Sequence, residues 1–192
     1  MFILFAIPIG IVLGLLFGGQ IGRLADLKFR WGWLAIGGLF VQVVLFSPPV
    51  ADVIGAAGPP VYVASTAAVL IAVLRNLRIP GLALVAAGAT CNLLAIAANG
   101  GIMPASRAAV ASLGMDAASG FSNSVVHRDP ALEPLTDIFA LPAWMPFANV
   151  FSVGDVLIGI GVALVIALGM RGRTESVTTG IPNTMTPAPR QD

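Results

Sequence analysis

Charged residues are scarce in this sequence, and cysteine and histidine each occur only once. Asp, Glu, Lys and Arg together make up 10% of the 192 residues, whereas a soluble domain has roughly a quarter. The formal net charge is +1 and there is no basic tract, so nucleic acid is excluded as a partner. The single cysteine, Cys91, excludes an intramolecular disulfide and a multi-cysteine metal site.

Apolar residues are abundant instead, at 57% of the sequence with a mean hydropathy of +0.94. They form five blocks, at residues 2–19, 31–46, 60–74, 81–98 and 151–170, and the charges cluster between them. Because a membrane-spanning helix needs about 20 largely apolar residues, the sequence predicts an all-α, polytopic transmembrane helical bundle of about five spans. The second and third blocks are short for this role. The first block has no basic region and no small-residue cleavage site, so we expect a retained helix and not a signal peptide.

Basic residues lie in alternate connections between the apolar blocks. They follow the first block, separate the third from the fourth, and follow the fifth: Arg23, Lys28, Arg30, Arg75, Arg78, Arg171 and Arg173. The positive-inside rule places these connections in the cytoplasm and residues 47–59 and 99–150 outside. The sequence therefore predicts a protein of the cytoplasmic (inner) membrane, with its N-terminus outside and its C-terminus inside.

The domain organisation is expected to be simple, with one membrane domain over residues 1–170. Residues 171–192 are rich in Thr, Pro, Gly and Asn and have little that can pack, which predicts a disordered cytoplasmic tail. No internal repeat is evident, and no ionisable residue lies near the middle of a block. Both features disfavour an ion-coupled transporter.

Glycine recurs every four residues in and after the first block, at Gly10, Gly14, Gly18 and Gly22. Such a face lets helix backbones approach closely in lipid, so it predicts packing against another helix of this chain or of a second copy. The matching small residues are expected to be Gly159, Gly161, Ala95 and Ala97.

Two amides lie within apolar blocks, Gln42 in the second and Asn92 in the fourth. An amide that faced lipid would lose its hydrogen bonds, so both are expected to face the interior and to form bonds between helices. This structural role is favoured over contact with a ligand.

The long outer segment, residues 99–150, is where any chemistry is expected. Its dense polar cluster contains His127, Asp129, Glu133 and Asp137, residue types that bind divalent metals or act in acid–base catalysis. Pro130 and Pro134 interrupt a helical ligand spacing, so a solvated loop is favoured, and neither a metal nor another cofactor is expected.

Local signals predict caps and turns around this segment. Ser106 precedes a short helix that is expected over residues 107–113 and to end at Gly114. Ser152 and Asp155 have the spacing of a capping box at the start of the last helix. The candidate binding residues lie near the two ends of the segment: Asn99, Gly100, Gly101, Met103, Pro104, Trp144 and Asp155.

Three strings in this region resemble those of a known family: NGGIMP at residues 99–104, LTDIFALP at residues 135–142 and VFSVGDVLIGIG at residues 150–161. The family is the bacterial membrane-protein family catalogued as domain-of-unknown-function family 5317 (DUF5317), and the resemblance covers about residues 1–170. It implies a multi-pass bacterial membrane protein and supplies no catalytic residues.

Three classes of function remain open on these grounds. The leading hypothesis is a non-enzymatic membrane module that binds a lipid-like molecule, a quinone or a partner membrane protein, including a second copy of itself. The alternative is an integral membrane enzyme with an external site at His127 and the neighbouring carboxylates. A small oligomeric transporter is the third class. A binding site is favoured if the three strings meet around one cavity, and a structural loop if they are dispersed.

Overall fold

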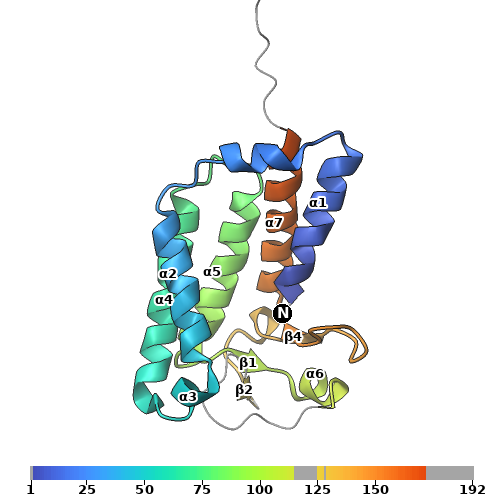
Figure 1. Ribbon diagram of the computed structural model, residues 1–192. Helices are drawn as coiled ribbons and strands as arrows, with labels where there is room; N and C mark the ends of the chain where they lie inside the picture. The colour runs from blue at the N-terminus through green and yellow to red at the C-terminus, as the bar shows by residue number, and fades with distance from the viewer. Residues whose placement is uncertain (1, 115–124, 128, 172–192) are drawn as a thin grey trace, which may run out of the picture.

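Apolar helices form the body of the molecule. The computed structural model describes residues 2–114, 125–127 and 129–171 (Figure 1). Of the predicted tail at 171–192, only Arg171 is described, and it is the last residue of the last helix. The longest helices occupy the five apolar blocks: α1 (Ala6–Leu16, preceded by the 3-10 turn η1, Phe2–Phe5), α2 (Gly32–Leu45), α4 (Gly58–Leu74), α5 (Leu82–Ala98) and α7 (Val153–Arg171). They run side by side along one axis (Figure 1).

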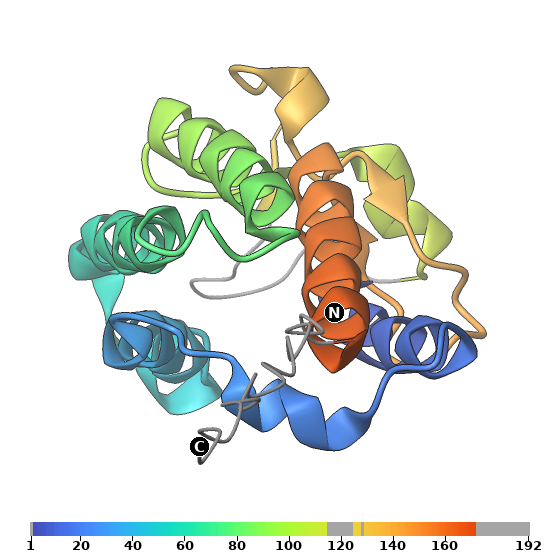
Figure 2. The same cartoon turned by 90° about the horizontal axis from the view of Figure 1, so that it is seen from above.

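The helices form a curved row and not a closed ring. Helix α2 packs on α4, α4 on α5, α5 on α7, and α7 on α1, so α2 and α1 stand at the two ends of the row (Figure 2). The 3-10 helix η2 (Ile21–Asp26) crosses the open side between them. It is anchored where the backbone N–H of Gln20 donates to the carbonyl of Met170 at 2.8 Å. We call the end of the bundle at which η2 lies the η2 end.

Two of these helices are long and apolar enough to cross a membrane, Gly55–Leu74 and Val153–Arg171. Three shorter apolar helices accompany them, at Ile3–Leu16, Gly32–Leu45 and Leu82–Ala98. The fold is therefore mostly helical, and two of its helices are an indication of membrane association.

The predicted glycine face packs on α7, but over a shorter length than expected. A Cβ atom placed on Gly10 would lie 2.8 Å from the carbonyl oxygen of Ala163, and one on Gly14 would lie 2.5 Å from the sulfur of Met170. Gly18 and Gly22 have nothing within 4 Å of that position, so within this chain they take no part in the packing on α7. The reason is that α1 ends at Leu16 and Gly18 adopts a φ of +75°, which turns the chain away from the helix axis.

The matching residues also differ from those expected. At Gly10 and Gly14, α1 meets Ala163, Ile166 and Met170 of α7. Gly161 packs instead on α5, where its Cβ position lies 2.8 Å from the carbonyl oxygen of Gly81. Ala95 is fully buried beside residues of α2 and α4, and Ala97 is exposed.

Side-chain amides join neighbouring helices. Gln42 of α2 donates to the hydroxyl of Thr66 of α4 at 3.3 Å, and Asn92 of α5 donates to the carboxylate of Asp155 of α7 at 2.9 Å. A third amide, buried Asn76, was not singled out from the sequence. Its side chain exchanges hydrogen bonds with the backbone N–H and C=O of Arg30, at 2.8 and 2.7 Å, and so ties the start of α2 to the end of α4.

The opposite end of the bundle, which we call the loop end, has short helices and small sheets (Figure 1). The short helices are α3 (Pro48–Ala51), η3 (Gly55–Ala57), α6 (Arg107–Ser112) and η4 (Glu133–Leu135). The strands are β1 (Pro104–Ala105) with β2 (Val125–Val126) in parallel, and β3 (Phe139–Ala140) with β4 (Val150–Phe151) in antiparallel. The expectation of purely helical structure is therefore corrected, because buried backbone groups of this long connection pair with one another.

Candidate functional site

The three strings that carry the family resemblance meet at the loop end. The N–H of Asp137 donates to the carbonyl of Pro104 at 3.0 Å, and the N–H of Ser106 donates to the carbonyl of Asp137 at 2.9 Å. These bonds align the segment around Asp137 in parallel with β1, on which β2 also pairs. The third string joins through the pairing of Phe139 with Phe151. The strings are therefore assembled into one unit and are not dispersed.

The side chain of Asn99 holds the segment around Ala131 in place. The amide of Asn99, at the end of α5, donates to the carbonyl of Ala131 and accepts from the N–H of the same residue, both at 2.8 Å. It imitates the paired bonds of a β-ladder and also donates to the carbonyl of Ala95 at 2.7 Å. Asn99 therefore positions the stretch that contains Pro130 and Glu133.

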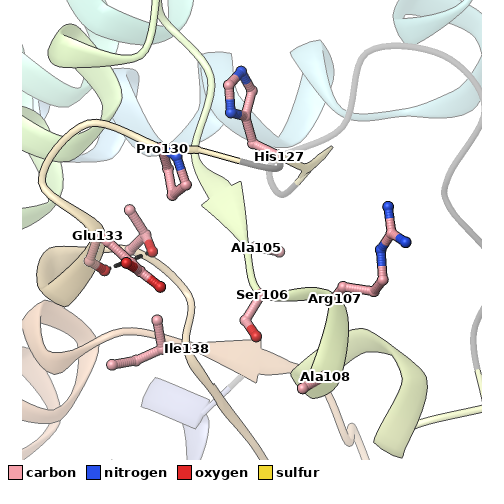
Figure 3. A pocket seen from close by; sticks show the side chains of 9 residues that line it. Ala105, Ser106, Arg107, Ala108, His127, Pro130, Glu133 and Ile138 are labelled. Carbon is pink, nitrogen blue, oxygen red and sulfur yellow. Dashed lines mark hydrogen bonds between the residues drawn. The ribbon is translucent and has the colours of Figure 1, made fainter.

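Parallel alignment places the residues that follow each strand at one edge of this unit. Ser106 follows β1, His127 follows β2, and Ile138 continues the segment paired at Asp137. A cavity of about 230 Å³ opens at this edge (Figure 3). It is lined by Ala105, Ser106, Arg107, Ala108, His127, Pro130, Glu133, Thr136 and Ile138.

The cavity has a buried floor and a charged rim. Ala105 and Thr136 are 2% and 1% exposed, whereas Arg107, His127 and Glu133 are exposed. Arg107 and Glu133 lie on opposite sides of Ala105, and His127 lies at a third position (Figure 3). The site therefore presents two basic groups and one carboxylate around a small apolar base.

Ser106 has a different role from the one predicted. The short helix α6 does begin directly after it, but the Ser106 side chain makes no capping hydrogen bond. Its hydroxyl lines the cavity instead (Figure 3). The helix start is held by backbone alone, with the N–H of Val110 donating to the carbonyl of Ser106 at 3.0 Å.

The predicted polar cluster is divided by the fold. His127 and Glu133 line the cavity, and Asp129 and Asp137 do not. Asp137 is 4% exposed and lies in sequence between the lining residues Thr136 and Ile138. Within residues 2–114, 125–127 and 129–171, no three His, Cys, Asp or Glu side chains are close enough to hold a metal ion.

Most of the predicted binding residues shape the loop end without reaching the cavity. Gly101 has a φ of +82°, and a Cβ atom there would lie 2.6 Å from the Cβ of Pro59, so a glycine is required. Gly100 is also in the left-handed region, at +71°. Met103 is buried, and Trp144 is 82% exposed and is not part of the cavity lining. Sequence reasoning missed the lining residues Arg107 and Thr136, because long-range pairing brings them to the cavity; Thr136 lies within the string LTDIFALP but was not singled out there.

Asp155 and Ser152 form the predicted capping geometry at the start of α7. The N–H of Asp155 donates to the hydroxyl of Ser152, and the N–H of Ser152 donates to the Asp155 carboxylate, both at 3.0 Å. Asn92 completes the network, because it donates to the other carboxylate oxygen and accepts from the Ser152 hydroxyl at 2.9 Å each. Asp155 therefore connects α7 to α5 and does not face the cavity lining.

The described residues thus define a mostly helical protein with two helices fit to cross a membrane and a pocket-bearing unit at one end. A family model described as a family of unknown function (DUF5317) matches residues 26–167. The chain belongs to this family, in agreement with the three strings. No match is found among curated proteins or among solved structures.

Proposed function

We propose that this chain is a five-span protein of the cytoplasmic membrane that binds the polar end of a lipid-like molecule without catalysing a reaction. The binding site is the cavity at the loop end, and that end faces outward. The observation that carries the proposal is the convergence of all three family strings on the unit that contains this cavity.

The surface of the helix row supports insertion of all five helices. On α2, the side chains of Trp33, Ile36 and Phe40 are 74%, 71% and 66% exposed, although the helix packs on α4. An apolar face of this kind is unfavourable in water and is satisfied by lipid. The two long helices carry the clearest spanning signal, and the shorter ones run beside them in the same row. A short span is accommodated by local thinning of the bilayer at modest cost.

The distribution of charge supports the orientation. The η2 end carries basic residues and few acids: Arg23, Lys28, Arg30, Arg75, Arg78 and Arg171, with Asp26. The loop end carries most of the described carboxylates: Asp52, Asp129, Glu133, Asp137 and Asp155. The positive-inside rule favours the η2 end in the cytoplasm.

Cysteine labelling in intact bacterial cells tests this orientation. In a Cys91→Ala background, an Asp52→Cys variant is expected to react with a membrane-impermeant maleimide. An Ala25→Cys variant is expected to react only after permeabilisation, because Ala25 lies in η2. Both positions are exposed, so accessibility differs only by the side of the membrane. The reverse pattern would overturn the orientation, and labelling of both in intact cells would overturn the membrane insertion of the bundle.

The size and chemistry of the cavity favour binding over catalysis. A volume of about 230 Å³ is below the range of roughly 300–1,000 Å³ found for drug-sized ligands, so it suits a headgroup whose tail remains in the bilayer. A catalytic base needs a second group that orients it. Among the residues described, the side chain of neither His127 nor Glu133 forms a hydrogen bond with another side chain of the cavity; Glu133 is bonded only through its backbone carbonyl, by Thr136.

Mass spectrometry of lipids that remain bound after gentle detergent extraction tests the binding role. Ala108→Trp fills the cavity from the exposed face of α6, and it is expected to lower the amount of co-purified lipid by at least about fivefold. Ala111→Trp is the matched control, because Ala111 is exposed on the same helix but does not line the cavity. If both variants retain as much lipid as the parent protein, the cavity is not the binding site.

A further inference from the structure

We infer that the cavity takes a group that carries both a phosphate and a primary ammonium ion, the chemistry of a phosphoethanolamine headgroup. This inference rests on the proposed function and specifies its ligand. It is drawn from the arrangement of charges and hydroxyl groups around the cavity.

The rim presents separated charges of opposite sign. Arg107 and Glu133 lie on opposite sides of the β1 residue Ala105 (Figure 3). Within the part of the chain that the structure describes, neither side chain forms an ion pair, so the two groups are too far apart to neutralise each other. A ligand with an anion at one end and a cation at the other would satisfy both at once.

Two hydroxyl groups also line the cavity. The Ser106 hydroxyl lines the cavity and makes no capping bond, so it can donate to a phosphate oxygen there. The Thr136 hydroxyl already donates to the carbonyl of Glu133 at 2.7 Å, so its lone pairs are left to accept from an ammonium N–H. His127 adds a second basic group on the rim.

Other lipid headgroups fit this arrangement less well. A purely anionic headgroup would bind at Arg107 but would leave Glu133 facing a negative charge. A quaternary ammonium has no N–H to donate to Glu133 or Thr136. A primary ammonium next to a phosphate avoids both penalties, and the buried floor at Ala105 strengthens the resulting hydrogen bonds by lowering the local dielectric constant.

Binding of lipids with identical acyl chains to the delipidated full chain in detergent, measured by native mass spectrometry, tests the inference. Phosphatidylethanolamine is expected to bind about fivefold more tightly than phosphatidylglycerol or phosphatidylcholine. Glu133→Gln should abolish the preference for phosphatidylethanolamine over phosphatidylglycerol while it leaves binding of the latter intact. Arg107→Gln should weaken binding of all three lipids, because it removes the phosphate contact that they share.

A soluble competitor shows whether the ligand with this headgroup is a membrane lipid or a soluble molecule. Glycerophosphoethanolamine that displaces the lipid only at far higher concentration indicates a membrane lipid as ligand, and equal potency indicates a soluble phosphoamine. Either result retains the headgroup chemistry. Equal binding of the three lipids, or a preference that survives in Glu133→Gln, would overturn the inference while leaving lipid binding itself in place. Absence of lipid from both the parent protein and Ala111→Trp would instead remove the proposed function.

Discussion

Gly88→Ala is expected to destabilise the protein by about 3 kcal/mol, because it forces apart the two helices with the most extensive contact in the described structure. A Cβ atom on Gly88 would lie 2.3 Å from the carbonyl oxygen of Gly154 and 2.9 Å from the backbone nitrogen of Ile158. Both are backbone atoms of α7, so no side-chain rotation relieves the clash. Thermal unfolding of the purified protein in detergent measures the effect, and the variant is expected to unfold at a lower midpoint temperature than the parent protein.

Gly37→Ala is the matched control for this prediction. Gly37 lies within α2, and nothing is within 4 Å of its Cβ position. An alanine there adds helix propensity without a clash, so stability should be unchanged or higher by up to about 1 kcal/mol. Equal loss of stability in the two variants would mean that α5 and α7 do not approach as closely as the structure has them.

Asp155→Leu is expected to destabilise the protein by about 3 kcal/mol, and Asp155→Asn by about 1 kcal/mol. Leucine removes both acceptors, which leaves the N–H of Ser152 and the amide of Asn92 without partners between two packed helices. Asparagine keeps one carbonyl oxygen, which still accepts from the Ser152 N–H, and it loses the bond from Asn92. The order is measured by unfolding of the three proteins in the same detergent.

A double-mutant cycle that combines Asp155→Asn with Asn92→Ala isolates the contribution of the hydrogen bond between these two side chains. The effects of Asp155→Asn and Asn92→Ala should be less than additive, because both remove the same interhelical bond. Strict additivity would show that the bond contributes nothing. If Asp155→Leu were as stable as the parent protein, the capping role of the carboxylate would be refuted.

Local signals were sufficient to predict the helical segments and the last helix cap. Each apolar block became a helix because its length and composition leave few other ways to satisfy the backbone. Ser152 and Asp155 lie three residues apart, so their reciprocal bonds depend on sequence spacing and little else. The amide of Asn92 was expected to bond across helices, although its partner could not be named.

The sequence alone did not predict where a helix ends or which distant residues come into contact. The four-residue spacing of glycine continues past Leu16, but the helix does not, so Gly18 and Gly22 do not join Gly10 and Gly14 in packing on α7. The spacing is a property of the sequence, and the end of α1 is set by where the chain must turn to cross the bundle.

By itself, the sequence determined the apolar segments, the family and the region in which a site was expected. The tertiary structure alone decided which polar residues share a cavity. Pairing of Pro104 with Val125 and of Ala105 with Asp137 brings Arg107 and Thr136 to a site with His127 and Glu133, while Asp129 is left outside the lining. These contacts join residues more than twenty positions apart through backbone hydrogen bonds, which carry no side-chain signature and so leave no pattern in the sequence.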